Sequence, residues 1–126
     1  MPVSVVDASA IGALLFGEPQ AERVATALEG RALAAPTLLP YEIASLCAKK
    51  IAARPAEERI LLEALGLFPS LNVALHAVPL AEAVSIARRR KLTTYDASYL
   101  WLATELGADL VTRDDTLARA WRCQRG

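Results

Sequence analysis

Residues that commonly bind zinc or form disulfides are scarce in this sequence. Its 126 residues include two cysteines and one histidine. Cys47 and Cys123 lie far apart in the chain, and neither has a second cysteine or a histidine close by. This spacing gives little support for a disulfide framework or a structural zinc site. The cysteine usage suits a reducing compartment, so we expect a cytoplasmic protein.

Long apolar runs and an excess of charge of either sign are also missing. Hydrophobic residues make up 54% of the chain, but no stretch reaches the ~18 apolar residues that a membrane span needs. The first ten residues have no basic segment before their apolar run, which is unlike a signal peptide. Fourteen basic and fourteen acidic residues give a net charge of zero, which would argue against nucleic-acid binding if the charges were evenly mixed. The length is typical of one domain, which we expect to span residues 1–126.

Short apolar runs alternate with segments of helical periodicity along the chain. The runs predict strands at residues 3–6, 32–36, 71–78 and 108–112. The periodic segments predict helices at residues 8–16, 21–28, 37–53, 56–68, 80–91, 96–106 and 114–123. Such alternation is typical of an α/β domain whose parallel sheet carries helices on both faces.

Four acidic residues occur where these elements begin or end. Asp7 directly follows the first predicted strand, and Asp114 lies just beyond the last. Sites in open parallel sheets form beyond the carboxyl ends of the strands. Glu42 and Asp96 lie near the start of predicted helices, where the helix dipole favours a carboxylate. We therefore expect these four side chains to meet at one edge of the sheet.

A cluster of carboxylates has a chemical consequence. Neighbouring negative charges repel one another and take up protons unless a cation neutralises them. An all-oxygen ligand set suits Mg²⁺ or Mn²⁺ rather than zinc, and His76 is expected in mid-strand away from the acids. Such a cation can activate a water molecule and neutralise charge on a phosphodiester. The acids therefore indicate a metal-dependent nuclease.

Each acid taken alone also has a purely structural explanation. Asp7, Asp96 or Asp114 could be a helix N-cap, and Glu42 could be an ordinary charge in a first helical turn. Asp115 adds an ambiguity, because two adjacent aspartates point in different directions. We favour Asp114 as the residue that faces a metal, and the combination of acids carries more weight than any one of them.

Four segments resemble the PIN-domain nucleases, and among them the VapC-type toxins of toxin–antitoxin pairs. These segments are VVDASA with Asp7, YEIA with Glu42, LTTYDASYLWLA with Asp96 and LVTRDDTLA with Asp114. The resemblance implies a PIN-like three-layer α/β/α domain with a central parallel sheet. The family commonly adds a short edge strand after the last helix, for which residues 121–126 offer little, so we expect four or five strands.

The same resemblance implies an activity and a set of site residues. The expected protein is a Mg²⁺-dependent endoribonuclease in which Mn²⁺ could replace Mg²⁺. Its expected catalytic and metal-binding residues are Asp7, Glu42, Asp96 and Asp114. Ser9 and Thr112 match small hydroxyl positions whose hydrogen bonds could orient a carboxylate or a water molecule. As a VapBC-type toxin it would cleave RNA, form a homodimer and be held inactive by a cognate antitoxin.

Other functions stay open at this level. The chain could be a PIN-like RNA-processing nuclease, or a module that binds RNA or protein without a toxin role. An aspartyl phosphatase with Asp7 as its nucleophile is disfavoured, because Ser9 stands where such enzymes place a second aspartate. If a metal neutralises four acids, fourteen basic residues face ten acidic ones, a balance suited to phosphate contact.

Several remaining features have two interpretations. The basic run at residues 88–91 either complements a helix dipole or forms a phosphate-binding rim. The aromatic residues Tyr95, Tyr99 and Trp101 could stack on bases, but in so apolar a helix we expect core or dimer contacts. The amphipathic segment 56–68, together with the apolar residues at 14–16, is the surface expected to meet a partner.

Overall fold

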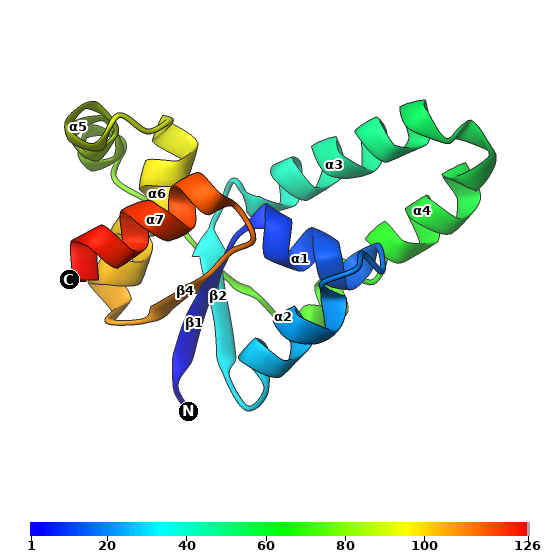
Figure 1. Ribbon diagram of the computed structural model, residues 1–126, viewed down its shortest axis with the longest axis horizontal. Coiled ribbons are helices and arrows are strands. Elements are labelled where there is room, and N and C mark those ends of the chain that lie inside the picture. The colour runs from blue at the N-terminus through cyan, green and yellow to red at the C-terminus, as the bar shows by residue number, and fades with distance from the viewer. Residues whose placement is uncertain (126) are drawn as a thin grey trace.

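The centre of the molecule is a parallel β-sheet. The computed structural model describes residues 1–125, and within them four strands lie in the order β3-β2-β1-β4 (Figure 1). Adjacent strands pair in parallel, and Val5 of β1 lies opposite Ala34 of β2 and Leu110 of β4. The strands are β1 Val3–Val6, β2 Ala32–Pro36, β3 Ala74–His76 and β4 Asp109–Val111.

Helices cover both faces of the sheet. Figure 1 shows α5, α6 and α7 on one side and α1, α2, α3 and α4 on the other, with α3 and α4 running side by side. This is the three-layer α/β/α arrangement expected from the sequence. The helices are α1 Ala8–Leu15, α2 Ala21–Leu28, α3 Leu39–Ala53, α4 Glu58–Leu65, α5 Leu80–Arg90, α6 Thr94–Leu106 and α7 Asp115–Arg125, with 3₁₀ turns at Pro55–Glu57 and Phe68–Leu71.

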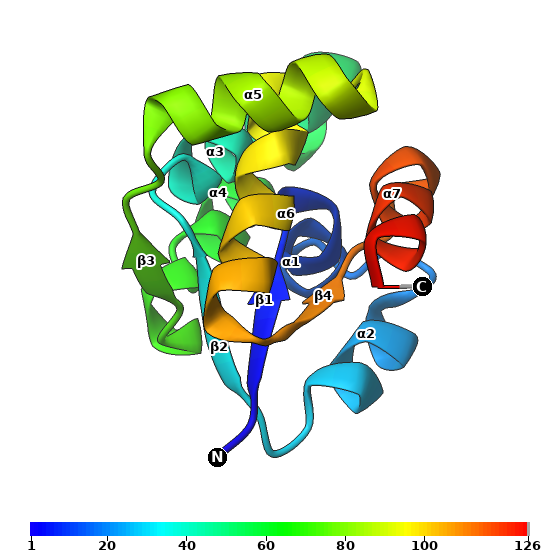
Figure 2. The ribbon, with the colours of Figure 1, turned by 90° about the vertical axis from the view of Figure 1, so that its left-hand side faces the viewer.

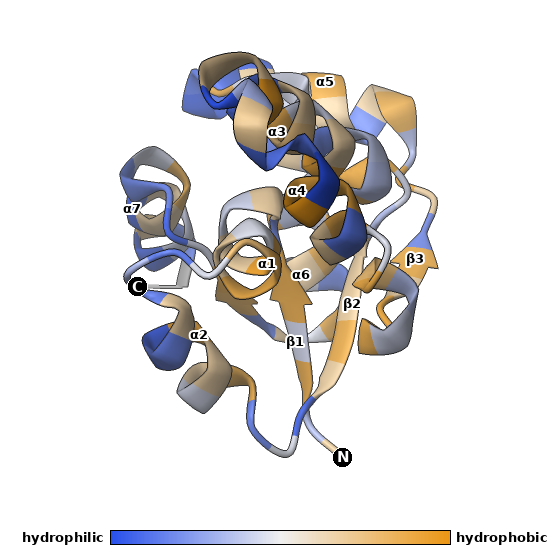
Figure 3. Ribbon diagram, turned by 90° about the vertical axis from the view of Figure 1, so that its right-hand side faces the viewer, coloured by the Kyte–Doolittle hydropathy of each residue, from blue (hydrophilic) through white to orange (hydrophobic). Residues whose placement is uncertain are grey.

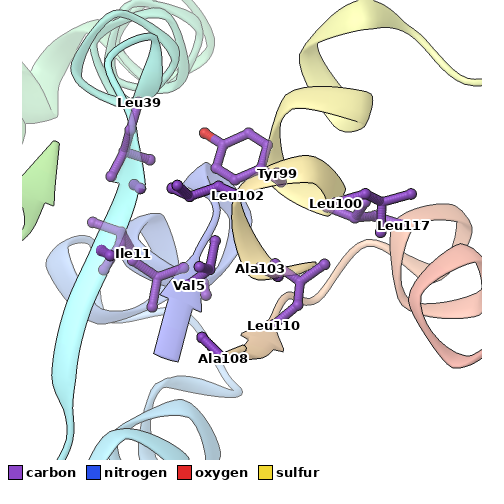
Figure 4. Packing of buried hydrophobic residues seen from close by; sticks show 14 of the residues in the cluster. Val5, Ile11, Leu39, Tyr99, Leu100, Leu102, Ala103, Ala108, Leu110 and Leu117 are labelled. Carbon is purple, nitrogen blue, oxygen red and sulfur yellow. The ribbon is translucent and has the colours of Figure 1, made fainter. Parts of the chain in front are cut away.

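The hydrophobic core includes side chains of α6 on one face of the sheet and of α1, α2 and α3 on the other. Figure 2 shows α6 in front of β1 and β2 with β4 beside it, and α6 packs against all three strands. Tyr99, Leu100 and Leu102 of this helix are at most 1% exposed and lie close to Val5 and other buried side chains in Figure 4. In Figure 3 the sheet and α1 are mainly hydrophobic, while α7 carries hydrophilic residues. Parallel strands are buried on both faces, which explains their nearly continuous apolar sequences.

The predicted helices are present, and their ends differ from the sequence-based bounds by a few residues. The largest difference concerns the helix expected at 56–68. In the structure a 3₁₀ turn precedes α4, and α4 ends at Leu65. Helix α6 starts two residues earlier than expected, because the hydroxyl of Thr93 accepts a hydrogen bond from the Asp96 N–H at 3.0 Å and caps the helix. None of the described helices is long and apolar enough to cross a membrane.

Two local expectations around the second and third strands were wrong. The predicted strand 71–78 is reduced to β3, because a 3₁₀ turn precedes it and Asn72 adopts a left-handed conformation with φ 53°. His76 therefore ends β3 instead of lying in mid-strand. The helix expected at 37–53 begins only at Leu39, and the Thr37 N–H instead donates to the His76 carbonyl beside β3.

Helix α6 offers a test of where the core lies. Leu102 is 1% exposed and Leu106, one turn later, is 37% exposed. We expect Leu102→Ala to lower the free energy of unfolding by about 2–5 kcal/mol, because it leaves a cavity against the sheet. Leu106→Ala, the matched control, should lower it by about 0.5 kcal/mol or less. Denaturant unfolding measures both, and equal losses would contradict this account of the core.

Candidate active site

Asp7 stands at the carboxyl end of β1, and its carboxylate accepts three hydrogen bonds. Its side chain is 6% exposed. Oδ1 accepts from the Ser9 hydroxyl at 2.8 Å and from the Ala10 N–H at 3.0 Å, while Oδ2 accepts from the Thr112 hydroxyl. The bond to Ala10 makes Asp7 the N-cap of α1. Asp7 thus caps the helix and also receives hydrogen bonds that the capping role does not require.

The two hydroxyls extend this arrangement to the loop after β4. Ser9 Oγ accepts a hydrogen bond from the Arg113 backbone N–H at 2.8 Å, and Thr112 Oγ1 accepts one from the Asp114 N–H at 2.9 Å. These bonds are possible because β1 and β4 pair in parallel and end at the same edge of the sheet. Ser9 and Thr112 therefore orient the Asp7 carboxylate and hold the Asp114 loop beside it.

Asp114 and Asp115 are separated by the start of α7. Asp114 precedes the helix, and its Oδ1 accepts the Leu117 N–H at 2.8 Å, as an N-cap does. Asp115 is the first residue of the helix and is exposed. The negative charge of Asp114 acts on both Asp7 and Asp96, in each case adding to a rise in pKa caused first by burial. This electrostatic contact favours Asp114 over Asp115 as the member of the acidic cluster.

Glu42 lies in the first turn of α3, as expected, and is half-buried. Its Oε1 accepts a hydrogen bond from the Tyr99 hydroxyl at 2.6 Å. Burial raises the pKa of Tyr99 far above its usual value, and the Glu42 carboxylate raises it further. Tyr99 therefore remains protonated and fixes Glu42 in position.

The role of Tyr99 was only partly predicted from the sequence. Its ring is in the core, as expected, but the interpretation overlooked the contact of its hydroxyl with an acidic residue. The available signal was spacing, since Tyr99 follows Asp96 by three residues and shares its face of the helix. Tyr95, by contrast, is 60% exposed, and Trp101 is half-buried.

Asp96 lies in the first turn of α6 and is half-buried. It is not the helix cap, because Thr93 takes that role. Burial raises the pKa of Asp96, and the negative charges of Asp114 and Asp7 raise it further. The capping explanation that the sequence left open for Asp96 is therefore wrong.

The four acids form one electrostatic cluster. Burial also raises the pKa of Glu42, against the lowering effect of the Tyr99 hydrogen bond, and the charges of Asp7 and Asp96 add to the rise. Each raised pKa reflects a carboxylate that lacks sufficient positive charge around it. Carboxylate oxygens are the donors that hard divalent cations prefer, so the chemistry of this set fits Mg²⁺ or Mn²⁺. Within residues 1–125, however, no three Asp, Glu, His or Cys side chains are arranged as a group that could hold a metal ion.

Glu18, which no sequence motif singled out, forms ion pairs with two basic residues. Glu18 Oε2 accepts from Arg113 Nη1 and Oε1 contacts Lys50 Nζ, both at 2.9 Å. Arg113 Nε also donates to Gln20 Oε1 at 3.0 Å. The hydrogen bond from Lys50 is the main reason that the pKa of Glu18 is lowered, and Arg113 contributes less. This network joins the Asp114 loop to the chain after α1 and to α3.

The basic run at residues 88–91 forms the end of α5. Its three arginines lie in the last turn, where they complement the helix dipole. Arg90 also donates to the Ala120 carbonyl at 2.7 Å and to Gln124 Oε1 at 3.3 Å, which connects α5 to α7. The alternative of a phosphate-binding rim therefore applies only to the exposed residues Arg88, Arg89 and Lys91.

Comparisons with known proteins agree with this fold. Residues 4–121 match the PIN domain family, and the chain belongs to that family. It is 36% identical over 119 residues to Ribonuclease VapC3 of Pyrobaculum aerophilum, an alignment that covers 90% of this chain and 91% of that protein. The resemblance to VapC-type PIN nucleases is thereby confirmed.

Two solved structures are similar to the whole domain. The crystal structure of PAE2754 from Pyrobaculum aerophilum superposes with a TM-score of 0.75 at 31% identity, covering 92% of this chain and 82% of that one. VapC20 of Mycobacterium tuberculosis, described as a toxin that cleaves the sarcin–ricin loop, gives a TM-score of 0.66 at 16% identity, covering 93% and 94%. At that identity the second comparison concerns the fold alone.

The raised pKa values predict how stability depends on pH in metal-free protein. When the folded-state pKa of an acid exceeds its unfolded value, the folded state binds more protons, and stability falls as the pH rises through the folded pKa. Asp7, Glu42 and Asp96 behave in this way, so the metal-free protein should be more stable near pH 5 than near pH 7.5. Glu18 has the opposite sign, but its contribution is lost only below its unfolded pKa of 4.5.

Thermal unfolding in a chelating buffer measures this dependence. Asp96→Asn should flatten it and stabilise the protein at neutral pH by about 0.5–2 kcal/mol, because it removes one of the repelling charges. Glu105→Gln is a matched control, since Glu105 is exposed on the same helix. Stability that rises between pH 5 and pH 7.5, or an equal response of both variants, would contradict the cluster.

Proposed function

We propose that this chain is a metal-dependent endoribonuclease and the toxin of a VapBC-type toxin–antitoxin system. Asp7, Glu42, Asp96 and Asp114 hold Mg²⁺, or Mn²⁺ in its place. The observation that carries the proposal is the placement of these acids in the fold. Asp7 and Asp114 follow β1 and β4, which end at one edge of the sheet, and Glu42 and Asp96 lie in the first turns of α3 and α6. A buried cluster of repelling carboxylates costs stability and is retained where a cation is to be bound.

Each side chain of the site has a definable task in hydrolysis. A divalent cation at the acids supplies an activated water molecule and neutralises charge on the phosphodiester. Ser9 and Thr112 hold the Asp7 carboxylate at a fixed angle, and Tyr99 does the same for Glu42. Since each of these donors occupies one side of a carboxylate, it limits the directions in which that carboxylate can present its oxygens to a ligand.

The proposed substrate and partners follow from the relatives. The protein that is 36% identical over nearly the whole chain is named a ribonuclease, which supports RNA as the substrate. We extend the proposal to a cytoplasmic protein that forms a homodimer and is inhibited by a cognate antitoxin. Helix α4 supplies apolar surface for such a partner, with Ile60 67% and Leu62 51% exposed. The apolar residues at 14–16 are half-buried against the core and expose less apolar surface to a partner.

RNA cleavage tests the enzyme and the choice of the fourth acid together. We expect cleavage in the presence of Mg²⁺ and none after chelation. Asp114→Asn should lower the rate by about 100-fold or more, because asparagine can still cap α7 but lacks the charge that holds a cation. Asp115→Asn is the matched control and should retain most of the activity. Cleavage that survives chelation, or an equal loss in both variants, would contradict the proposed site.

A growth experiment tests the toxin role separately. Expression of the wild-type chain alone should arrest growth of a bacterial host, and the Asp114→Asn variant should not, because arrest requires cleavage of cellular RNA. Colony counts after induction measure the difference, with variant protein levels checked on a blot. Purified protein that cleaves RNA without slowing growth would favour a PIN-like RNA-processing nuclease.

A further inference from the structure

A groove leads away from the acidic cluster along α3. It lies between the start of α1 and one face of α3 and has a volume of about 200 Å³. Ser9, which bonds to Asp7, and Glu42 form the end of the groove that belongs to the candidate site. Ser45, Leu46 and Lys49 line the rest of it.

The residues of α3 in this groove share one face of the helix. Ser45 follows Glu42 by three positions and Lys49 follows Ser45 by four, which is the spacing of neighbours on a helix surface. The two turns from Glu42 to Lys49 extend roughly 10 Å along the helix. The basic residue Lys49 therefore lies at the far end of the groove, and the acid Glu42 lies at the end next to the candidate site.

Lys49 differs from the other basic residues of this region in its ion pairs. A phosphate that approaches four acids needs compensating positive charge from the protein or a bound ion. Arg113 adjoins Asp114 and Lys50 follows Lys49 on α3, but both side chains form ion pairs with Glu18. The ammonium of Lys50 also lies 5.6 Å from the centroid of the Phe16 ring. Lys50 and Arg113 thus share the single carboxylate of Glu18 inside the fold.

Lys49 differs from its neighbour Lys50 in each of these respects. It is exposed and lines the groove. Within residues 1–125 it forms no ion pair with an acidic side chain. Its ammonium is therefore available to a ligand that occupies the groove.

We propose that this groove holds the sugar-phosphate backbone of the RNA beside the cleaved bond, with Lys49 contacting a phosphate and Ser45 donating a hydrogen bond to the same strand. The inference rests on the proposed ribonuclease function and adds to it the path of the substrate. It also assigns different roles to two adjacent lysines. Lys49 binds substrate, while Lys50 holds Glu18 in the fold.

Salt-dependent RNA binding tests this assignment. The full chain carrying Asp96→Asn, to suppress cleavage, is titrated with a fluorescently labelled single-stranded RNA of mixed sequence in Mg²⁺ at several salt concentrations. Adding Lys49→Gln should weaken binding several-fold at low salt. It should also reduce the slope of log K against log[salt] by about 0.7, the value for one phosphate contact with a single strand. Lys49→Arg should restore the slope.

Lys50→Gln is the matched control in the same background. It should lower the melting temperature by removing the Glu18 ion pair and leave the salt slope unchanged, whereas Lys49→Gln should leave the melting temperature unchanged. An unchanged slope in Lys49→Gln, or an equal change in both variants, overturns the groove while leaving the ribonuclease proposal standing. If the parent binds no RNA and the wild type cleaves none, the ribonuclease proposal itself fails and the groove assignment falls with it.

Discussion

The site depends on the hydrogen bonds that Asp7 receives from Ser9 and Thr112. Thr112 follows β4 and lies 105 residues from Asp7, whereas Ser9 is the second residue of α1 and lies two residues from Asp7. The two bonds meet on one carboxylate at the edge of the sheet. They are possible because β1 and β4 pair in parallel and end together. The same two hydroxyls accept from the Arg113 and Asp114 backbones, which brings the last acid into the cluster. Asp7 is thus both the cap of α1 and the point at which the loop after β4 is attached.

The cluster is held together against electrostatic repulsion. Burial and mutual repulsion raise the pKa values of Asp7, Glu42 and Asp96, so the charged form of each is disfavoured in the folded protein. Hydrogen bonds partly offset this effect. The Tyr99 hydroxyl, for example, donates to Glu42 and lowers the pKa of that carboxyl. Functional sites commonly accept such local instability because the compensating ligand arrives only on binding.

The basic residues of this region have two different roles, one in the fold and one in the proposed binding of RNA. Glu18 engages Arg113 and Lys50 and thereby connects the Asp114 loop to α3. Both cations are thus engaged in ion pairs within the fold. Lys49 lies one position away from Lys50 on α3 but faces the groove. Zero net charge is therefore compatible with nucleic-acid binding, because pairing inside the fold decides which charges a ligand meets.

The sequence by itself determined the alternation of strands and helices, and with it the edge at which Asp7, Glu42, Asp96 and Asp114 would meet. These features are local, since hydrophobic periodicity and strand ends are encoded by adjacent residues. The sequence favoured Asp114 over Asp115, and the structure agrees, because the charge of Asp114 acts on Asp7 and Asp96. The tertiary structure alone decided that Tyr99 bonds Glu42 and that Glu18 holds two cations. It also shortened the third strand through the left-handed conformation of Asn72. These outcomes depend on side chains far apart in the chain or on a single backbone angle, and periodicity carries no information about either.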